Sequence, residues 1–185
     1  MSPRETKDTT PTLLELDELE EGTTRWSFEI AAAELDLEDQ YLTVPKPVQV
    51  SLSVVCSIHN FSVAGTIHFE VAAECSRCLA ATTQAVDATV KVLIQRKEAS
   101  GEELEAIEDQ DGVDIVHPGT QTVDLKRHLR DSAMIELPTR IQCSPNCQGL
   151  CSQCGQDLNA GPCHCAELRS DPRWSALADL KNDLH

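Results

Sequence analysis

Eight of the nine cysteines occur at spacings typical of metal ligands. Cys75 and Cys78 form a Cys-x2-Cys pair, and six more cysteines follow between Cys143 and Cys165. A two-residue spacer lets two thiolates of one tight turn face a single tetrahedral zinc ion, with zinc–sulfur bonds of about 2.3 Å. One such pair alone is weak evidence, but eight cysteines in this arrangement favour zinc strongly. The predicted ligands are Cys75, Cys78, Cys143, Cys147, Cys151, Cys154, Cys163 and Cys165.

Separation along the chain predicts how these ligands divide between two ions. The eight-residue excursion from Cys154 to Cys163 can return to its own metal, so the last four cysteines close a compact local site. The two predicted sites are therefore Cys75, Cys78, Cys143 and Cys147, and Cys151, Cys154, Cys163 and Cys165. The alternative is one site from Cys75, Cys78, Cys151 and Cys154, with the other four cysteines loosely placed or without metal. Two further alternatives are His164 in place of one sulfur and iron in place of zinc.

All-sulfur ligand sets predict structural metal sites. A catalytic zinc needs an open coordination position, usually with histidine or carboxylate ligands and a nearby base. The sequence has no glycine-rich phosphate loop and no Ser/His/Asp spacing that stands out, so it gives no reason to predict an enzyme. A zinc-thiolate redox sensor, which would release its metal on oxidation, is the alternative function. The ninth cysteine, Cys56, is expected to be a buried, inert thiol.

The net charge of −16, from 31 acidic and 15 basic residues, excludes a general attraction to nucleic acid. Basic proteins are the favoured partners, or RNA is touched only through a local positive patch. The concentrated basic groups lie on a predicted helix, after it, and inside the first cysteine pair. The possible RNA or partner contacts are Arg77, Lys126, Arg127, Arg130 and Arg140.

A sheet must position these groups, because apolar residues alternate with polar ones over long stretches. The alternation runs from Val48 to Ile58, resumes from Phe61 to Ala73 after a tight turn at His59–Asn60, and recurs from Val86 to Ile94. Period-two patterning is typical of half-buried strands. The sequence therefore predicts an antiparallel sheet with one face in water. Aromatic residues make up only 3%, so its core is expected to consist mainly of Val, Ile, Leu and Ala.

The predicted fold class is α+β: an antiparallel β-sheet core with one or two helices and a cysteine-rich, zinc-stapled C-terminal region. Helical spacing and a final Pro138 indicate a helix near 122–137, and Asp171–Pro172 indicates the start of a second one. The acidic segment 98–114 is expected to be a solvated loop. The predicted organisation is a mobile acidic N-terminal arm at 1–22, the sheet domain at 23–142 and the zinc-binding region at 143–185.

The cytoplasm is the expected location. The N-terminal residues lack the apolar stretch of a signal peptide and the basic bias of a transit peptide, and no apolar run approaches the length of a bilayer span. A reducing compartment keeps thiols free, which favours metal binding over disulfides.

The sequence also resembles a known family. The matching motifs are Glu74-Cys75-x2-Cys78-Leu79, Leu137-Pro138, Cys147-x-Gly149-Leu150-Cys151-x2-Cys154-Gly155-x2-Leu158-Asn159 and Asp171-Pro172-Arg173. They resemble the YceD family, described as large-subunit ribosomal RNA accumulation proteins, over roughly residues 20–184. The resemblance implies a ribosome assembly factor that supports accumulation of large-subunit (23S) ribosomal RNA. It supplies no catalytic or RNA-contact residue.

The resemblance and the charge together predict the partners. Because the chain is acidic, we expect it to hold a basic ribosomal protein or another assembly factor and so protect the RNA indirectly. The expected partners are therefore a large ribosomal subunit precursor, a basic ribosomal protein or rRNA. No membrane and no small-molecule substrate are expected.

Overall fold

The computed structural model describes residues 11–58, 60–97 and 113–165 of the chain. Three predictions fall wholly or partly elsewhere. The first residues of the N-terminal arm, most of the 98–114 loop and the helix expected from Asp171 lie outside the described residues.

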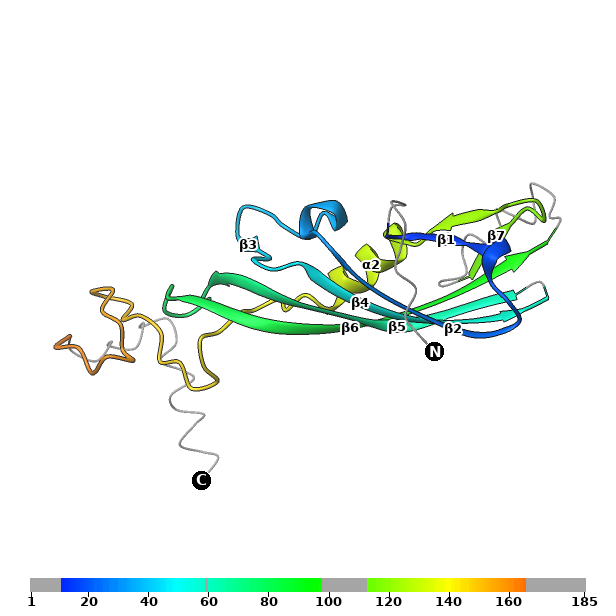
Figure 1. Ribbon diagram of the computed structural model, residues 1–185. Helices are drawn as coiled ribbons and strands as arrows, with labels where there is room; N and C mark the ends of the chain where they lie inside the picture. The colour runs from blue at the N-terminus through cyan, green and yellow to red at the C-terminus, as the bar shows by residue number, and fades with distance from the viewer. Residues whose placement is uncertain (1–10, 59, 98–112, 166–185) are drawn as a thin grey trace, which may run out of the picture.

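The centre of the fold is a six-stranded, mostly antiparallel sheet, and the cysteine-rich segment lies beyond one end of it (Figure 1). Among the strands of the described residues, only β6 and β7 pair in parallel. The predicted α+β class with an antiparallel sheet is thus confirmed. In sheet order the strands are β2 (Gly22–Ile30), β4 (Val48–Ser57), β5 (Asn60–Glu74), β6 (Ala81–Arg96) and β7 (Val113–Val116), and the short β3 (Leu42–Thr43) also pairs with β5.

Alternating burial explains why these segments form strands. In β4, Val48, Val50 and Val54 are 1% exposed or less, whereas Gln49 and Ser51 between them are exposed. A strand that places every second side chain in the core fixes its register, because a shift by one residue would expose the whole apolar set. The predicted strand pair on either side of residue 59 and the predicted third strand are confirmed.

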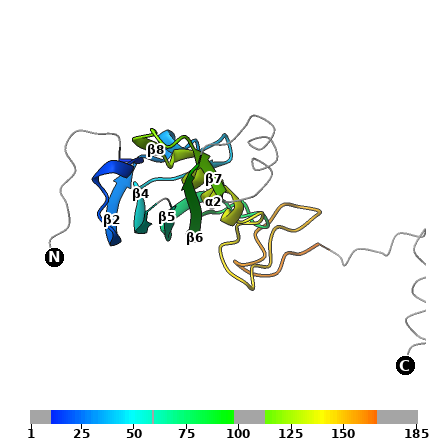
Figure 2. The same ribbon diagram turned by 90° about the vertical axis from the view of Figure 1, so that its right-hand side faces the viewer.

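A second layer covers one face of this sheet (Figure 2). It contains a two-stranded sheet of β1 (Leu13–Glu15) and β8 (Thr122–Asp124), followed by helix α2 (Lys126–Glu136). Two 3-10 turns, η1 (Leu16–Glu18) and η2 (Ala32–Leu35), precede and follow β2. The layer contributes Leu14, Leu16, Leu35, Leu125, Leu129 and Ala133 to the core.

Part of the predicted mobile arm belongs to this layer, which corrects the prediction for residues 11–22. Leu14 and Leu16 are 4% and 2% exposed, and Leu14 pairs with Val123 of β8. The leucines among the acidic residues therefore bury against the core, where hydrophobic burial offsets the loss of chain entropy.

The helix near 122–137 is confirmed from Lys126 onward, and its predicted start is wrong. Thr122 and Val123 are in β8, where they pair with Glu15 and Leu14. Asp124, the last residue of β8, accepts a hydrogen bond from the backbone N–H of Lys126 at 2.9 Å, and the helix begins at Lys126. No helix within the described ranges is long and apolar enough to cross a membrane.

Candidate metal centres

The first Cys-x2-Cys pair forms the turn between the two longest strands. Strand β5 ends at Glu74 and β6 begins at Ala81, so Cys75 and Cys78 lie in the connection. Cys75 donates its N–H to the Ala80 carbonyl at 2.8 Å and accepts one from Leu79 at 3.0 Å. Cys75 is fully buried and Cys78 is 7% exposed. Both residues therefore lie inward at the end of the sheet.

Backbone hydrogen bonds bring the segment after α2 to this turn. Ser76 donates to the Ile141 carbonyl at 2.8 Å, and Leu150 donates to the Arg77 carbonyl at 3.1 Å. Figure 1 shows the cysteine-rich segment, in orange, beyond the ends of β5 and β6. The first cluster, in which all four sulfurs lie within 4.8 Å of one another, consists of Cys75, Cys78, Cys143 and Cys147.

The second cluster is local. Gly155 donates its N–H to the Cys151 carbonyl at 2.9 Å, and Cys151 donates to Gln156 at 2.8 Å, which closes the turn around the second Cys-x2-Cys pair. The sulfurs, again within 4.8 Å of one another, are those of Cys151, Cys154, Cys163 and Cys165. The grouping by chain separation therefore matches the structure, and the alternative grouping of Cys75, Cys78, Cys151 and Cys154 is wrong.

The sulfur separations fit a tetrahedral ion. A tetrahedron with metal–sulfur bonds of 2.3 Å has sulfurs about 3.8 Å apart. The observed separations are 3.8 Å between Cys75 and Cys147 and 3.6 Å between Cys78 and Cys143. Cys151 and Cys163 lie 3.4 Å apart. A disulfide needs about 2.05 Å, and all these cysteines are free thiols, so both clusters could bind metal ions.

Backbone N–H groups favour the thiolate form of one cysteine in each cluster. The N–H groups of Cys143, Cys78 and Arg77 lower the pKa of Cys75 to about 6. In the second cluster, the N–H groups of Cys154 and Gln153 lower the pKa of Cys151 to about 6. Thiolates are the form that ligates metal, so these turns prepare the sulfurs for a cation.

Neighbouring sulfurs have the opposite effect on a second cysteine in each cluster. The sulfur of Cys147 raises the pKa of Cys143 to about 12, and the sulfur of Cys154 raises the pKa of Cys165 to about 12. Four sulfurs so close together cannot all ionise without a compensating positive charge. A divalent cation would supply that charge.

Asn159 links the two clusters, and sequence reasoning assigned it no role. Its Nδ2 donates to the Cys147 sulfur at 3.4 Å, and its Oδ1 accepts the Gln148 N–H at 2.7 Å. The hydrogen bond from Asn159 is the main reason why the pKa of Cys147 is lowered. Asn159 lies within the excursion from Cys154 to Cys163, so the loop of the second cluster supports a ligand of the first.

The predicted basic contacts occupy two separate places. Arg77 and Arg140 line one cavity of about 460 Å³ beside the first cluster. Lys126, Arg127 and Arg130 lie on α2 and do not line that cavity.

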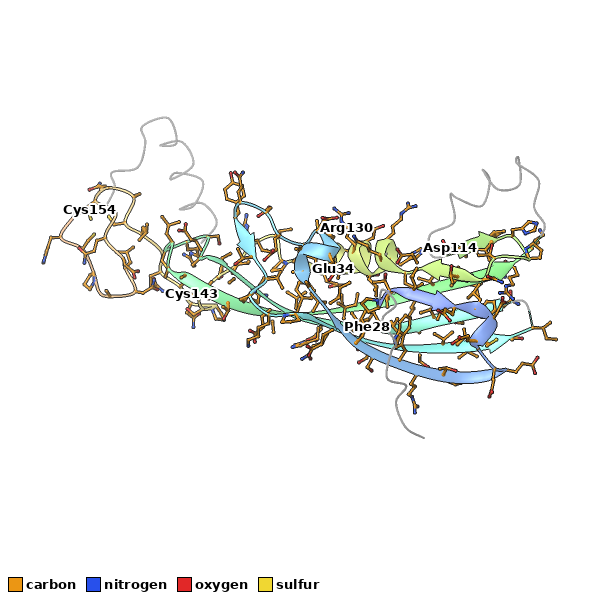
Figure 3. All side chains as sticks on the ribbon, turned by 45° about the horizontal axis from the view of Figure 1, so that its top comes forward. Phe28, Glu34, Asp114, Arg130, Cys143 and Cys154 are labelled. Carbon is orange, nitrogen blue, oxygen red and sulfur yellow. The ribbon has the colours of Figure 1, made fainter. Side chains whose placement is uncertain are left out.

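The remaining candidates stand apart from the clusters. Cys56 belongs to neither group, is partly buried and packs against the core from β4. His164 is likewise not part of either group. Figure 3 shows Cys143 and Cys154 together at one end of the molecule, with Asp114 toward the other.

Fold and clusters define a class: an α+β sheet protein with two four-cysteine clusters that could bind metal ions, the first of them at the end of its longest strands. The chain belongs to the YceD family. The family model described as "Large ribosomal RNA subunit accumulation protein YceD" matches residues 63–181, a span that includes α2 and both clusters.

Individual relatives are bacterial and plant proteins. An uncharacterized protein of Mycobacterium leprae is 32% identical over 148 residues, covering 80% of this chain and 65% of its own length. An uncharacterized protein of Mycobacterium tuberculosis is 33% identical over 118 residues, covering 64% of this chain and 54% of its own length. The Arabidopsis thaliana protein named "Large ribosomal RNA subunit accumulation protein YCED homolog 1, chloroplastic" is 24% identical over 159 residues, covering 75% of this chain and 50% of its own length.

The chain thus spans about half to two thirds of the length of these relatives. No solved structure matches it.

Proposed function

We propose that this chain is a cytoplasmic ribosome assembly factor that supports the accumulation of large-subunit (23S) ribosomal RNA. The observation that carries the proposal is the family match over residues 63–181, which takes in helix α2 and the two cysteine clusters. The name of the Arabidopsis relative supports the same role. The proposal assigns the chain no catalytic step, since its distinctive groups are all sulfur ligands.

We propose zinc as the metal of both clusters. The four-sulfur donor sets and sulfur separations of 3.4 to 3.8 Å suit a closed tetrahedral site. Bound there, zinc would cross-link the β5–β6 turn to the segment after α2. Structural zinc contributes about 10–16 kcal/mol of apparent binding free energy, which is comparable with or larger than the net stability of a typical domain.

In this role the chain would bind a ribosomal protein, RNA or another assembly factor within the precursor particle. The charges favour the cluster end of the molecule as the contact region. On α2, Arg127 lies 3.7 Å from the Asp131 carboxylate and Arg130 lies 3.6 Å from it and 4.0 Å from that of Asp36, so part of their charge is used within the chain. Arg77 and Arg140 take part in no ion pair among the described residues.

Sedimentation of cell extracts tests this function. A tagged chain is expected to co-sediment with large-subunit precursors, and depletion is expected to lower large-subunit rRNA relative to small-subunit rRNA. The control is a Cys75→Ser/Cys78→Ser variant, which should lose the association because the first cluster cannot form. Absence from all ribosomal fractions, with rRNA levels unchanged, would contradict the proposal. Release of metal by mild peroxide in a chain that does not sediment with precursors would support a redox sensor instead.

A further inference from the structure

Among the described residues, a cavity beside the first cluster is lined by hydrogen-bond donors and by no carboxylate. Its volume is about 460 Å³, and its lining residues are Ser76, Arg77, Arg140 and Gln142. They offer a hydroxyl, two guanidinium groups and an amide. In a chain with 31 acidic and 15 basic residues, a cavity whose described lining has two positive and no negative side chains is a distinct environment.

Both guanidinium groups are available to a ligand. Arg77 and Arg140 are exposed, and neither forms an ion pair within the part of the chain that the structure describes. By contrast, the Arg96 guanidinium is paired with Asp17 and lies over the Phe61 ring. A planar guanidinium matches the oxygens of a phosphate, and two of them can hold one phosphate or two neighbouring ones.

The cavity depends on the first cluster. Ser76 and Arg77 lie between the ligands Cys75 and Cys78, and Gln142 immediately precedes Cys143. The hydrogen bond from Ser76 to the Ile141 carbonyl, at 2.8 Å, joins the two segments that form the walls. A metal ion in the first cluster would therefore hold the two arginines at a fixed separation, so that less conformational entropy is lost on binding.

An exposed aromatic side chain lies at the same end of the sheet. Strand β3 pairs with β5 at Leu42 and Ala73, two residues before Cys75. Tyr41, next to Leu42, is 76% exposed and is the one exposed aromatic residue among those described. Cationic groups that follow a phosphate backbone, together with an aromatic ring for stacking, are typical of single-stranded nucleic-acid sites. Paired bases in a duplex do not offer their faces in this way.

We propose that this end of the molecule binds single-stranded RNA, with Arg77 and Arg140 on backbone phosphates and Tyr41 as a stacking surface. The inference rests on the proposed function, for which it names the RNA class and the contact residues. It also accounts for RNA contact by a chain of net charge −16, because the proposed phosphate contacts are confined to one cavity.

Anisotropy of a labelled oligouridine of about twelve nucleotides, titrated with the zinc-loaded full chain at several salt concentrations, tests the inference. An Arg77→Gln/Arg140→Gln variant should bind about 100-fold more weakly, roughly tenfold for each charged contact. The slope of log affinity against log salt should fall by about 1.4, since each single-strand phosphate contact contributes about 0.7. Tyr41→Ala should lower affinity about tenfold and leave the slope unchanged, because stacking carries no charge.

The matched control is Arg25→Gln/Lys91→Gln, which removes the same charge from exposed positions on β2 and β6. This control should change RNA affinity by less than about twofold at salt concentrations that screen distant charges. An equal loss in both double variants would overturn the inference, because a general field effect would explain it.

The competing explanation is that the arginines only neutralise the cysteine cluster. Zinc content is therefore measured for each variant, together with Arg140→Gln alone, whose change lies outside the cysteine turn. Loss of zinc with unchanged RNA affinity would overturn the inference. Failure of the unmodified chain to bind the oligonucleotide would overturn it as well, yet co-sedimentation through a protein partner would leave the proposed function intact. RNA binding without co-sedimentation would support the inference about RNA and contradict the proposed function.

Discussion

Around Cys147, a residue that is not a ligand supports the charge of the sulfur. Asn159 donates to this sulfur at 3.4 Å and accepts the N–H of Gln148 at 2.7 Å. The amide thus both favours the thiolate and holds the turn that carries it. Groups of this kind around metal ligands commonly change metal affinity by about 10- to 100-fold when they are replaced.

Replacement of Asn159 by Asp should weaken zinc binding at the first cluster by about 10- to 100-fold. The variant keeps the shape of the side chain and the acceptor for Gln148, but it loses the donor to Cys147 and places a carboxylate beside the thiolate. Competition with a chromophoric chelator measures the effect. Asn146→Asp, an equal charge change at an exposed residue next to Cys147, is the control and should have a much smaller effect. Equal losses in the two variants would show that charge alone matters.

The ligands could be predicted from the sequence, whereas Asn159 could not. Cysteine pairs with short spacers are local patterns, and chain separation alone gave the correct grouping. The role of Asn159 depends on a loop that returns twelve residues after Cys147. Its presence between two ligand pairs and in the motif that resembles the YceD family was the available signal, and that signal does not identify the acceptor.

Among the elements, the turn that connects the clusters packs tightly against the β5–β6 turn. Gly149 has φ 76°, and a Cβ built there would lie 3.1 Å from the Arg77 carbonyl oxygen, close to the hydrogen bond that Leu150 donates to the same oxygen. Gly155 has a similar φ of 72° and no atom within 4 Å of the corresponding position. The two glycines share a left-handed backbone, but only Gly149 is also required by close packing.

Alanine at the two glycines should therefore have unequal effects. Gly155→Ala adds only left-handed strain of about 1–2 kcal/mol, so zinc affinity of its own cluster should fall about tenfold. Gly149→Ala adds the same strain and crowds the Arg77 carbonyl, which should weaken the first cluster by roughly a further tenfold. Chelator competition on both variants provides the comparison. If Gly155→Ala proved as damaging as Gly149→Ala, the packing of the two turns would be less important than proposed.

Long elements could be predicted, and short ones could not. Strands β4, β5 and β6 carry enough alternating residues for their periodicity to be recognised. Strands β1 and β8 have three residues each, too few for a period, and they form because each pairs with the other over the core. The same pairing moved the start of α2 to Lys126. Tertiary contacts therefore determine the short strands and the start of α2, which the local sequence pattern does not specify.

At the scale of the molecule, the buried side chains of the described residues form two separate clusters. The large one fills the space between the sheet and the second layer. The small one contains only Cys75, Cys78 and Cys147, with Leu150 packed against it. So few apolar groups cannot offset the entropy of ordering the segment that carries them. Two bound metal ions would supply the missing stabilisation and would attach this segment to the end of the sheet, where the proposed RNA site lies.

The zinc content of the reduced full chain, purified without chelators, tests this account most directly. We predict two zinc ions per chain in the unmodified protein and in Cys56→Ser, because Cys56 lies outside both clusters. One zinc ion is expected in Cys75→Ser/Cys78→Ser, whose second cluster keeps all four sulfurs. A chain without bound metal, or equal zinc content in the unmodified and Cys75→Ser/Cys78→Ser proteins, would contradict the account.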